Sequence, residues 1–501
     1  MDFLSHLATG FATVAQPTNL LFCFIGCFLG TAIGVLPGIG PMGTIAILLP
    51  LTFGFSPESS LIMLAGIYYG AQYGGSTTAI LLNLPGEASS AVTAIDGYQM
   101  ARNGRAGAAL AIAAIGSFIA GTVATLVIAI FAVPLTSMAL KFGPADYFSL
   151  MVLGLVASIA LARGSILKGL VMIVLGLLLG TVGTDLYTGT LRFTLGTMDL
   201  ADGIPVVAFG VGLYALGEIL RGLQRETDKS TGHVALTSLM PTRKDAAEAA
   251  LPIVRGTLLG SILGVLPGGG AMLSSFASYA IEKKLSKEPE EFGHGALAGV
   301  AGPESANNAG AQTSFIPMLT LGIPSNPIMA LMVAALILQG VAPGPNLVNE
   351  QPELFWGTIA SMWIGNLMLV VLNLPLVGLW VKLLRIKNHF LFPAILGFSA
   401  IGVYSISNNS FDLMVMALFG CVGYGLDKLD CEPAPLLLGF VLGPMMEEYL
   451  RRSMILSSGD PSVFVTRPIS AGLLVLAAVL LAIVFMPAIR KQREEVFVEE
   501  D

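Results

Sequence analysis

Apolar stretches long enough to cross a lipid bilayer recur along the whole chain, and they restrict its fold more than any other feature. Residues 106–135 and 354–381 are two examples, and roughly 18 to 20 apolar residues suffice to cross ~30 Å of hydrocarbon. Only 11% of the 501 residues are charged, whereas about a quarter are charged in a soluble domain. We therefore predict an all-α integral membrane protein with about eleven transmembrane helices. A water-soluble enzyme is excluded.

Glycine and proline are spread through these apolar stretches, with 59 Gly and 28 Pro in the chain. Membrane helices tolerate both residues where neighbouring protein satisfies the freed backbone groups. We therefore expect re-entrant or broken helices among the spans. The four cysteines lack the spacing of zinc ligands, and the chain contains no HExxH or phosphate-loop motif. The sequence predicts neither an enzyme nor a bound metal or organic cofactor.

Short basic loops orient the chain in the membrane. Clusters of Lys and Arg occur in both halves, at residues 102–105, 163–168, 221–255, 283–287, 382–387, 428 and 490–493. Loops rich in these residues stay in the cytoplasm. We therefore predict a multi-pass protein of the bacterial inner membrane, with a periplasmic N-terminus and a cytoplasmic C-terminus. A few basic residues, Lys141 and Arg192 among them, fall on the outer side.

An internal repeat is the most informative pattern in the sequence. Residues 30–40 read GTAIGVLPGIG and residues 260–270 read GSILGVLPGGG, so that seven residues recur 230 positions later. The same offset relates Pro205 to Pro435. A looser match joins GGSTTAILLNLPG at 74–86 to GAQTSFIPMLTLGIPS at 310–325, where the offset drifts to 239. The chain is therefore predicted to contain two related halves.

The repeat and the apolar runs together divide the chain. The first repeat is predicted over 1–221, with a re-entrant hairpin at about 18–53 and spans at about 59–83, 106–135, 146–162, 166–184 and 203–221. A cytoplasmic loop is predicted over 222–252, the second repeat over 253–450, and a last transmembrane helix at about 470–487 with a cytoplasmic tail, within 451–501. Five spans separate the two LPG motifs, and an odd number inverts the second half. We therefore predict two repeats of inverted topology.

Inverted repeats place broken helices face to face near the middle of the bilayer. The free N–H groups and partial positive charge at half-helix N-termini attract anions, so the sequence favours transport of a small organic anion such as a di- or tricarboxylate. The glycines of the two LPG turns permit close approach of the backbone to a ligand. They equally permit close helix packing or a kink, and the sequence leaves both interpretations open.

Polar side chains interrupt the apolar stretches at two places, 72–86 and 304–314. Their hydroxyl and amide groups can bind carboxylate oxygens, and exposing them to lipid would cost several kcal/mol per unsatisfied group. Hydrogen bonding between helices is the alternative role. With the glycines of the turns they form the predicted substrate-binding set: Gly38, Gly40, Gly74, Gly75, Ser76, Thr77, Thr78, Asn83, Gly268, Gly270, Ser305, Asn307 and Asn308.

Glu304 is a carboxylate in a stretch predicted to lie in the membrane, and such residues are candidates for functional sites. We predict that Glu304 and Thr313 couple transport to a cation, Na⁺ or H⁺. The alternative is that Glu304 caps a helix start near the membrane surface, together with Pro303.

Four segments of the chain are similar to one known family. They are GTAIGVLPGIGP, YYGAQYGGSTTAILLNLPGE, GVLPGGGAMLSSFASYAIEKK and FGHGALAGVAGPESANNAGAQTSFIPMLTLGIPS. Over residues 18–450 the chain resembles the large transmembrane subunit, TctA, of the tripartite tricarboxylate transporters. The resemblance implies secondary transport driven by a cation gradient, a small TctB-like membrane subunit, and a periplasmic TctC-like protein that captures citrate or a related carboxylate. It also implies that positions 34–40, 74–78, 264–270 and 304–308 hold the substrate or ion site.

Two other classes of protein share this hydropathy pattern. A stand-alone carboxylate exporter or channel would need no binding protein. An intramembrane enzyme would need a convergent set of ionisable groups, which the sequence does not contain. The resemblance implies binding-protein-dependent, cation-driven import of di- or tricarboxylates, and a stand-alone carboxylate or anion exporter or channel is the alternative.

Overall fold

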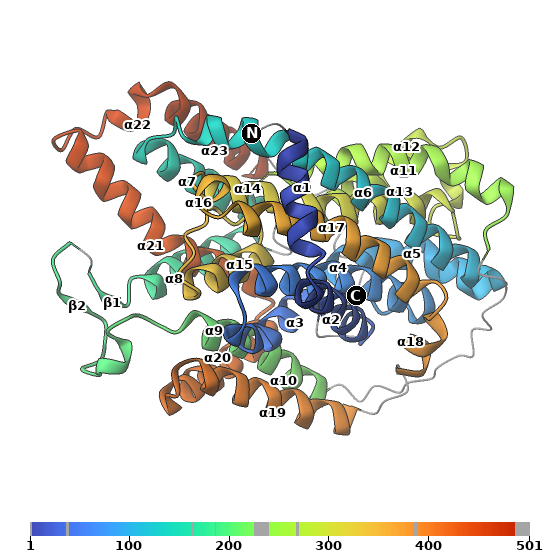
Figure 1. Ribbon diagram of the computed structural model, residues 1–501, viewed down its shortest axis with the longest axis horizontal. Coiled ribbons are helices and arrows are strands. Elements are labelled where there is room, and N and C mark those ends of the chain that lie inside the picture. The colour runs from blue at the N-terminus through green and yellow to red at the C-terminus, as the bar shows by residue number, and fades with distance from the viewer. Residues whose placement is uncertain are drawn as a thin grey trace.

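The protein is described by a computed structural model that covers residues 3–36, 40–161, 165–185, 187–224, 240–266, 270–383 and 388–485 (Figure 1). Within these ranges the chain is almost entirely helical, and its one sheet has two short antiparallel strands, β1 (Gly183–Thr184) and β2 (Leu191–Arg192). Seven helical segments of this part of the chain are long and apolar enough to cross a membrane. The prediction of an all-α membrane protein is confirmed.

Apolar helices follow one another along the whole described chain. The seven long segments are Pro17–Gly34 (α2), Ala88–Ala139 (which ends with α6, Ala106–Ala139), Val206–Leu223 (in α9 to α10), Arg243–Leu263 (α11), Pro352–Asn373 (α17), Ser410–Lys428 (α20) and Pro468–Phe485 (α23). Six shorter ones are Phe3–Val14 (α1), Gly40–Thr52, Pro144–Ile159 (in α7), Ile166–Gly180 (α8), Pro327–Leu338 (α15) and Phe392–Ser407 (in α19). Helix α4 (Pro57–Leu82) has 26 residues and carries the first polar cluster.

The chain reverses direction between α2 and α3 (Gly40–Leu48), on either side of the first LPG motif. Asn19, near the start of α2, accepts a hydrogen bond from Ser59, near the start of α4, at 2.6 Å. By the start of α4 the chain has therefore returned to the end at which α2 began. Helices α2 and α4 consequently run parallel, with α3 as the returning arm of a hairpin.

Glycines spaced four residues apart let α2 touch the backbone of α4. A Cβ atom added at Gly30 would lie 2.3 Å from the carbonyl oxygen of Ile67, which is far inside van der Waals contact. The same close approach occurs one turn before and one turn after, at the pairs Gly26–Met63 and Gly34–Ala71. Small residues bring membrane helices together in this way because lipid provides no hydrophobic driving force for their association.

The second half repeats this packing at the positions that the sequence repeat predicts. Gly256, Gly260 and Gly264 of α11 follow their counterparts in α2 by 230 residues and lie against the backbone of α13 (Ala298–Thr313). Their contacts are Gly302, Ala306 and Gly310, which follow the contacts in α4 by 239 residues. Both offsets in the sequence therefore relate residues at equivalent places in the structure.

The equivalent helices α4 and α13 cross in opposite directions. Tyr69 of α4 packs against Phe315, the first residue of α14 (Phe315–Leu321), with ring centroids 5.8 Å apart. Further along α4, Ser76 donates a hydrogen bond to Glu304, which lies earlier in the chain, at 2.6 Å. Residue numbers thus rise along α4 as they fall along α13. Because the two helices are equivalent, the prediction of inverted-topology repeats is confirmed.

Other helices exchange partners between the halves as a two-fold axis requires. Helix α6 packs on α13, and α17 packs on α4 (Figure 1). In the same way α8 packs on α21 (Pro433–Leu456). Helix α20 packs on η5 (Val211–Leu216), the π-helical segment that joins α9 (Val206–Gly210) to α10 (Gly217–Gln224). Helices of each half therefore pack against helices of the other half.

Two boundaries differ from the sequence-based expectation. Helix α11 begins at Arg243, inside the predicted cytoplasmic loop 222–252, because Thr242 and Asp245 form a capping box. The apolar run 354–381 is also not one helix, since α17 ends at Asn373 and α18 (Val377–Leu383) follows a turn. Pro375 lies in that turn and cannot donate a backbone hydrogen bond to a continuing helix. The predicted tail beyond residue 485 lies outside the described residues.

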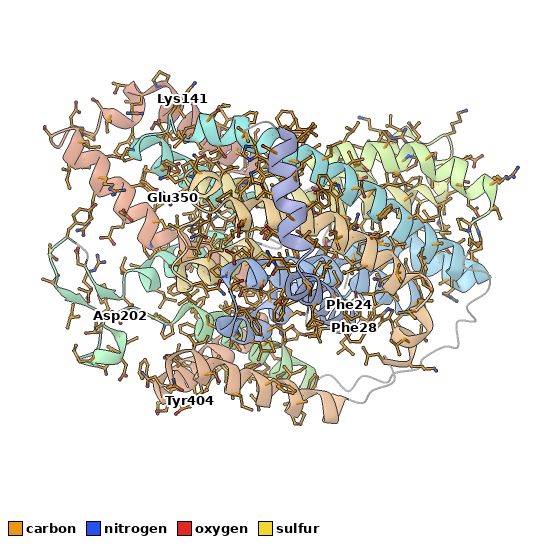
Figure 2. All side chains as sticks on the ribbon, viewed as in Figure 1. Phe24, Phe28, Lys141, Asp202, Glu350 and Tyr404 are labelled. Atoms are coloured by element: carbon orange, nitrogen blue, oxygen red, sulfur yellow. The ribbon has the colours of Figure 1, made fainter. Side chains whose placement is uncertain are left out.

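Large apolar side chains point outward on many helices. Phe24 of α2 and Tyr404 of α19 (Asn388–Ser407), both labelled in Figure 2, are each 44% exposed. Most side chains of α23 are likewise exposed. Such an apolar exterior is suited to contact with lipid and is uncommon in soluble monomers.

We expect Gly30→Ala to destabilise the protein by about 1–3 kcal/mol, since the added methyl group must push α2 away from the carbonyl of Ile67. Thermal unfolding of the purified protein in lipid nanodiscs measures the loss. Gly472→Ala in α23 is the matched control, because a Cβ atom there would meet no atom within 4 Å. Equal stability of the two variants would contradict the packing described.

The connection that follows α8 is attached to α21 by charged groups. The Asp185 carboxylate accepts hydrogen bonds from the backbone N–H of Tyr187 at 2.8 Å and from Arg451 at 2.9 Å. Arg192 of β2 pairs with Glu447 at 2.7 Å. The Tyr187 N–H and the Arg451 guanidinium lower the pKa of Asp185 to about 2.

The attachment of this connection should therefore weaken in acid. The pKa of Asp185 in the folded protein, about 2, lies below its ordinary value, so the stabilisation is complete above pH ~4 and is lost as the pH falls towards 2. Hydrogen exchange of residues 183–192 should accelerate as the pH falls from about 4 to about 2, relative to that of α21. Asp185→Asn should remove most of this difference, and an unchanged pH response in that variant would disprove the assignment.

Candidate functional site

Both halves contain a helix break at the same place. Helix α4 ends at Asn83 with a left-handed φ of 55°, and α14 ends at Gly322 with a φ of 72°, which is 239 positions later. The chain then turns back, and Glu87 caps the next helical turn, η2 (Ala88–Ser90). Its equivalent, Asn326, caps α15 and accepts a hydrogen bond from the N–H of Met329 at 3.0 Å. Each half therefore places a polar side chain at the N-terminus of a half-helix.

The tips of the two hairpins lie beside these breaks. In the first half a Cβ atom built on Gly40 would be 3.4 Å from the carbonyl oxygen of Gly86, and in the second half one on Gly270 would be 3.1 Å from the Asn326 amide. The N-termini of α3 and α12 (Gly270–Leu285) thus meet the breaks. The first tip lies near Gly74, past the middle of α4. Gly38 and Gly268 lie outside the described residues.

The two halves touch through these breaks. Ser275 of α12 donates to the backbone carbonyl of Ser89 at 2.8 Å, and Asn307 of α13 donates to the carboxylate of Glu87 at 3.1 Å. We call the group formed by Ser76, Glu87, Ser89, Thr93, Ser275, Glu304 and Asn307 the polar seam. It runs along the crossing of α4 and α13, in the middle of the protein.

Glu304 lies at the centre of the polar seam and is fully buried. One carboxylate oxygen accepts the Ser76 hydroxyl at 2.6 Å, and the other accepts the Thr93 hydroxyl. Glu304 lies within α13 and not at its start, which rules out the alternative of a cap near the membrane surface. Glu304 and Glu87 form no ion pair within the described residues, where Arg and Lys side chains pair with other acids.

A small space adjoins Glu304 between α4, α6, α13 and α17. Its volume is about 10 Å³, which is room for a single water molecule or ion. Six of its lining residues carry side-chain oxygens: Tyr73, Ser76, Thr77, Ser117, Glu304 and Asn373. The Oδ1 atom of Asn373 is buried and has no hydrogen-bond partner.

The Glu304 cluster of the polar seam has no chemical counterpart in the other half. The residues related to Glu304, Ser76 and Thr93 by the 239-residue offset are Ala65, Phe315 and Met332. All three are buried and apolar. The fold is therefore nearly symmetric, whereas its buried charge lies on one side of the axis.

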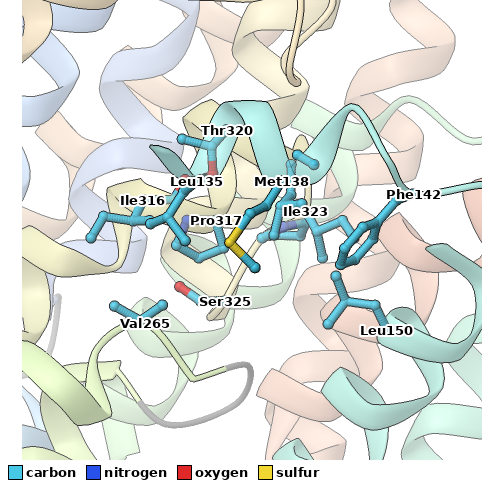
Figure 3. Close-up of a pocket in the computed structure, with 13 residues that line it drawn as sticks. Leu135, Met138, Phe142, Leu150, Val265, Ile316, Pro317, Thr320, Ile323 and Ser325 are labelled. Carbon is cyan, nitrogen blue, oxygen red and sulfur yellow. Dashed lines mark hydrogen bonds between the residues drawn. The ribbon is translucent and has the colours of Figure 1, made fainter. Parts of the chain in front are cut away.

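A second and larger cavity lies beside the second hairpin. It has a volume of about 180 Å³ and is lined almost entirely by apolar side chains, among them Leu135, Met138 and Phe142 of α6 and its extension (Figure 3). Val265 of the second LPG motif and Ser325 of the second break border it (Figure 3). Its lining contains too few polar groups to hold a carboxylate anion in preference to water.

Comparison with known families adds to this geometry. The model described as "Tripartite tricarboxylate transporter TctA family" matches residues 20–438. The chain belongs to the TctA family. An Agrobacterium vitis protein described as an uncharacterized 52.8 kDa protein in the TAR-I ttuC′ 3′ region is 64% identical over 501 residues, which is the full length of both chains.

A second Agrobacterium vitis protein, described as an uncharacterized protein in the TAR-II ttuC′ 3′ region, is 65% identical over 242 residues. This match covers 48% of the present chain and all of that protein. No solved structure matches the chain.

The structure of this TctA-family protein brings together some of the predicted site residues. Ser76, Asn307 and Glu304 belong to the polar seam, and Thr77 lines the small space beside it. Asn308 donates to Ser117 of that space at 2.6 Å. The remaining contacts are local to each half: Gly75 lies against Glu87, Gly74 against the backbone of α2, and the Thr78 hydroxyl donates to the carbonyls of Gly74 and Gly75.

Three other predicted residues lie apart from the seam. Asn83 is exposed at the end of α4, where it adopts the left-handed conformation that ends the helix. The Ser305 hydroxyl donates to Ala301 within its own helix. The Thr313 hydroxyl donates to the carbonyl oxygen of Ala309, beside Gly264 of α11. The assigned roles of these residues in binding and coupling stay predictions.

Sequence reasoning missed Glu87, Thr93, Ser117 and Asn373. Glu87 follows the LPG residues at 84–86 directly, and the 239-residue offset relates it to Asn326, so the repeat contained the signal. Asn373 is one of two amides, with Asn366, in the apolar run 354–381, and such residues mark polar contacts within the protein. Thr93 and Ser117 belong to no motif and could be found only from the packing of helices.

We expect Ser76→Ala to destabilise the protein by about 1–3 kcal/mol, because the buried Glu304 carboxylate loses a hydroxyl donor. Thermal unfolding in nanodiscs measures the effect. Ser405→Ala is the control, since the Ser405 hydroxyl is exposed and donates only to Ile401 of its own helix. If both substitutions had the same small effect, the Ser76–Glu304 hydrogen bond would be unimportant.

Proposed function

We propose that the chain is the large membrane subunit of a binding-protein-dependent secondary transporter that imports di- or tricarboxylates and is driven by a cation gradient. Membership of a tripartite tricarboxylate transporter family supports transport of this class and the need for partners. The proposed partners are a small TctB-like membrane subunit and a periplasmic TctC-like binding protein. In this proposal the chain lies in the bacterial inner membrane, with its N-terminus periplasmic and its C-terminus cytoplasmic.

The proposed mechanism rests on one observation: two acids in the polar seam, Glu87 and Glu304, form no ion pair with a basic side chain among the described residues. Glu87 and Glu304 both belong to the polar seam, and a substrate anion near them would add to the negative charge there. Neutralising a buried carboxylate is worth several kcal/mol. Binding of a cation at the seam would therefore raise the affinity for the anion, and by linkage the anion would raise the affinity for the cation.

The N-termini of half-helices supply the complementary attraction for the substrate. Those of α3 and α12, at Gly40 and Gly270, lie beside the breaks and carry partial positive charge. In the proposed cycle a binding protein delivers the carboxylate from the periplasm, the carboxylate binds near these termini, and the two halves move to expose it to the cytoplasm. Because the movement is favourable only with both ligands bound, the cation gradient drives uptake.

The substrate contacts belong to the same proposal. Gly38, Gly268, Ser76, Thr77, Asn307 and Asn308 remain the first candidates, with Glu304 as the cation-coupling residue. Glu87 joins them, because it lies at the break and contacts Asn307 at 3.1 Å.

Uptake of radiolabelled citrate and related carboxylates into liposomes tests this function. The liposomes would contain the chain and the small membrane subunit, with the binding protein outside. We expect uptake that requires the binding protein and an inward Na⁺ or H⁺ gradient. Glu304→Gln should reduce uptake at least tenfold, whereas Thr136→Val should leave it unchanged, since the Thr136 hydroxyl donates only within α6.

The competing function is that of a stand-alone carboxylate exporter or channel. Transport that needs no binding protein would favour it. Uptake that ignores both the Na⁺ and the H⁺ gradient would disprove cation coupling.

A further inference from the structure

We propose that the small space beside Glu304 is a binding site for a dehydrated Na⁺ ion. The role of this ion as the coupling ion rests on the proposed function, whereas the binding site itself does not. The site itself is argued from the side chains of α4, α6, α13 and α17.

The donor set is the kind that a hard monovalent cation requires. All polar lining groups present oxygen atoms, which hard cations prefer over nitrogen or sulfur. Glu304 is the one carboxylate among the residues that line the space, so a single positive charge balances it. A second acid would be needed to balance a divalent ion of the same size.

The hydroxyl groups around the space have lone pairs to offer. Ser76 directs its proton to Glu304, and Thr77 directs its proton to the Tyr73 carbonyl. Ser117 accepts the proton of the Asn308 amide at 2.6 Å. Each of the first two oxygens therefore keeps acceptor capacity that is not used by its own hydrogen bond.

Asn373 provides an independent sign of a missing ligand. Its amide nitrogen donates to the carbonyl of Leu369 at 2.9 Å, which fixes the orientation of the amide. Asn373 lines the space, and its Oδ1 atom is buried without a hydrogen-bond partner, since the residue is only 5% exposed. A buried carbonyl oxygen without a donor is unfavourable, and a cation would satisfy it.

Size and charge agree with the same ion. The space, about 10 Å³, admits one ion or water without a hydration shell. Both carboxyl oxygens of Glu304 accept a hydroxyl hydrogen bond. No cationic side chain within the described part of the chain forms an ion pair with this group, so Na⁺ fills that role.

Occupancy of this site would act on the break next to it. Asn307, which holds Glu87, lies one turn beyond Glu304 on α13. A Na⁺ ion beside Glu304 lowers the negative potential at Glu87 and thus at the N-terminus of η2. An anion then binds near the adjacent N-termini of α3 and α12 with less repulsion, which makes binding of the two ions cooperative.

Binding of ²²Na⁺ to the purified full-length chain in nanodiscs, at constant pH and without substrate or partner proteins, tests the site. We expect saturable binding that unlabelled Na⁺ displaces and K⁺ does not. Glu304→Gln should weaken the affinity at least tenfold, and Ser117→Ala and Asn373→Ala several-fold. Thr125→Val should leave it unchanged, because the Thr125 hydroxyl lies two turns further along α6 and bonds Gly121 and Gln312.

A thermal shift provides the second readout. Na⁺ should raise the unfolding temperature of the wild type and of Thr125→Val, but not that of Glu304→Gln, since a ligand stabilises only the state that binds it. Should Glu304→Gln fail to fold, Ser117→Ala and Asn373→Ala decide the matter.

The absence of saturable Na⁺ binding to the wild type would overturn the proposal, and so would unchanged affinity in all three site variants. Such a result would mean that the space holds water and that Glu304 carries a proton. Failure of carboxylate uptake alongside intact Na⁺ binding would instead remove the proposed transport function and leave the cation site in place.

Discussion

The contact between glycine-lined helices determines where everything else in this protein lies. Because Gly30 and Gly260 have no side chain, α2 and α11 rest directly on the carbonyl groups of α4 and α13. Each hairpin can then reach past the middle of the helix that it packs against, and its tip meets the helix break. A hairpin held one side chain further away would leave the half-helix N-termini facing lipid, where unsatisfied N–H groups cost several kcal/mol.

The backbone follows the inverted symmetry of the two halves, whereas the buried charge does not. The backbone repeats itself closely, as the matched caps at Glu87 and Asn326 illustrate. The side chains at the crossing do not, since Glu304 has Ala65 as its counterpart. A symmetric pair of charged sites would have placed two more acids within the same low-dielectric region, at a cost of several kcal/mol per unpaired charge. A symmetric scaffold with one charged site avoids this cost.

The sequence predicted the membrane class, the two repeats and their opposite orientation, because these depend on hydropathy, identity at a fixed offset and the number of spans. It also singled out Glu304, whose charge stands out in an apolar context. It did not predict Thr93, Ser117 or Asn373, because hydroxyl and amide groups are common in membrane helices and only packing tells which of them share a cavity. The start of α11 at Arg243 was missed because a capping box at Thr242 begins the helix before the apolar run does.

The repeat allows the apolar cavity beside the second hairpin to be compared with the equivalent place in the first half. Its border residues Val265 and 323–325 correspond to Val35 and 84–86 in the first half. If each half adopted the conformation of the other, this cavity would close on one side of the bilayer, and the equivalent cavity of the first half would open on the other side. In the transport cycle proposed above, the difference between the halves in a single conformation would therefore indicate the shape of the second conformation.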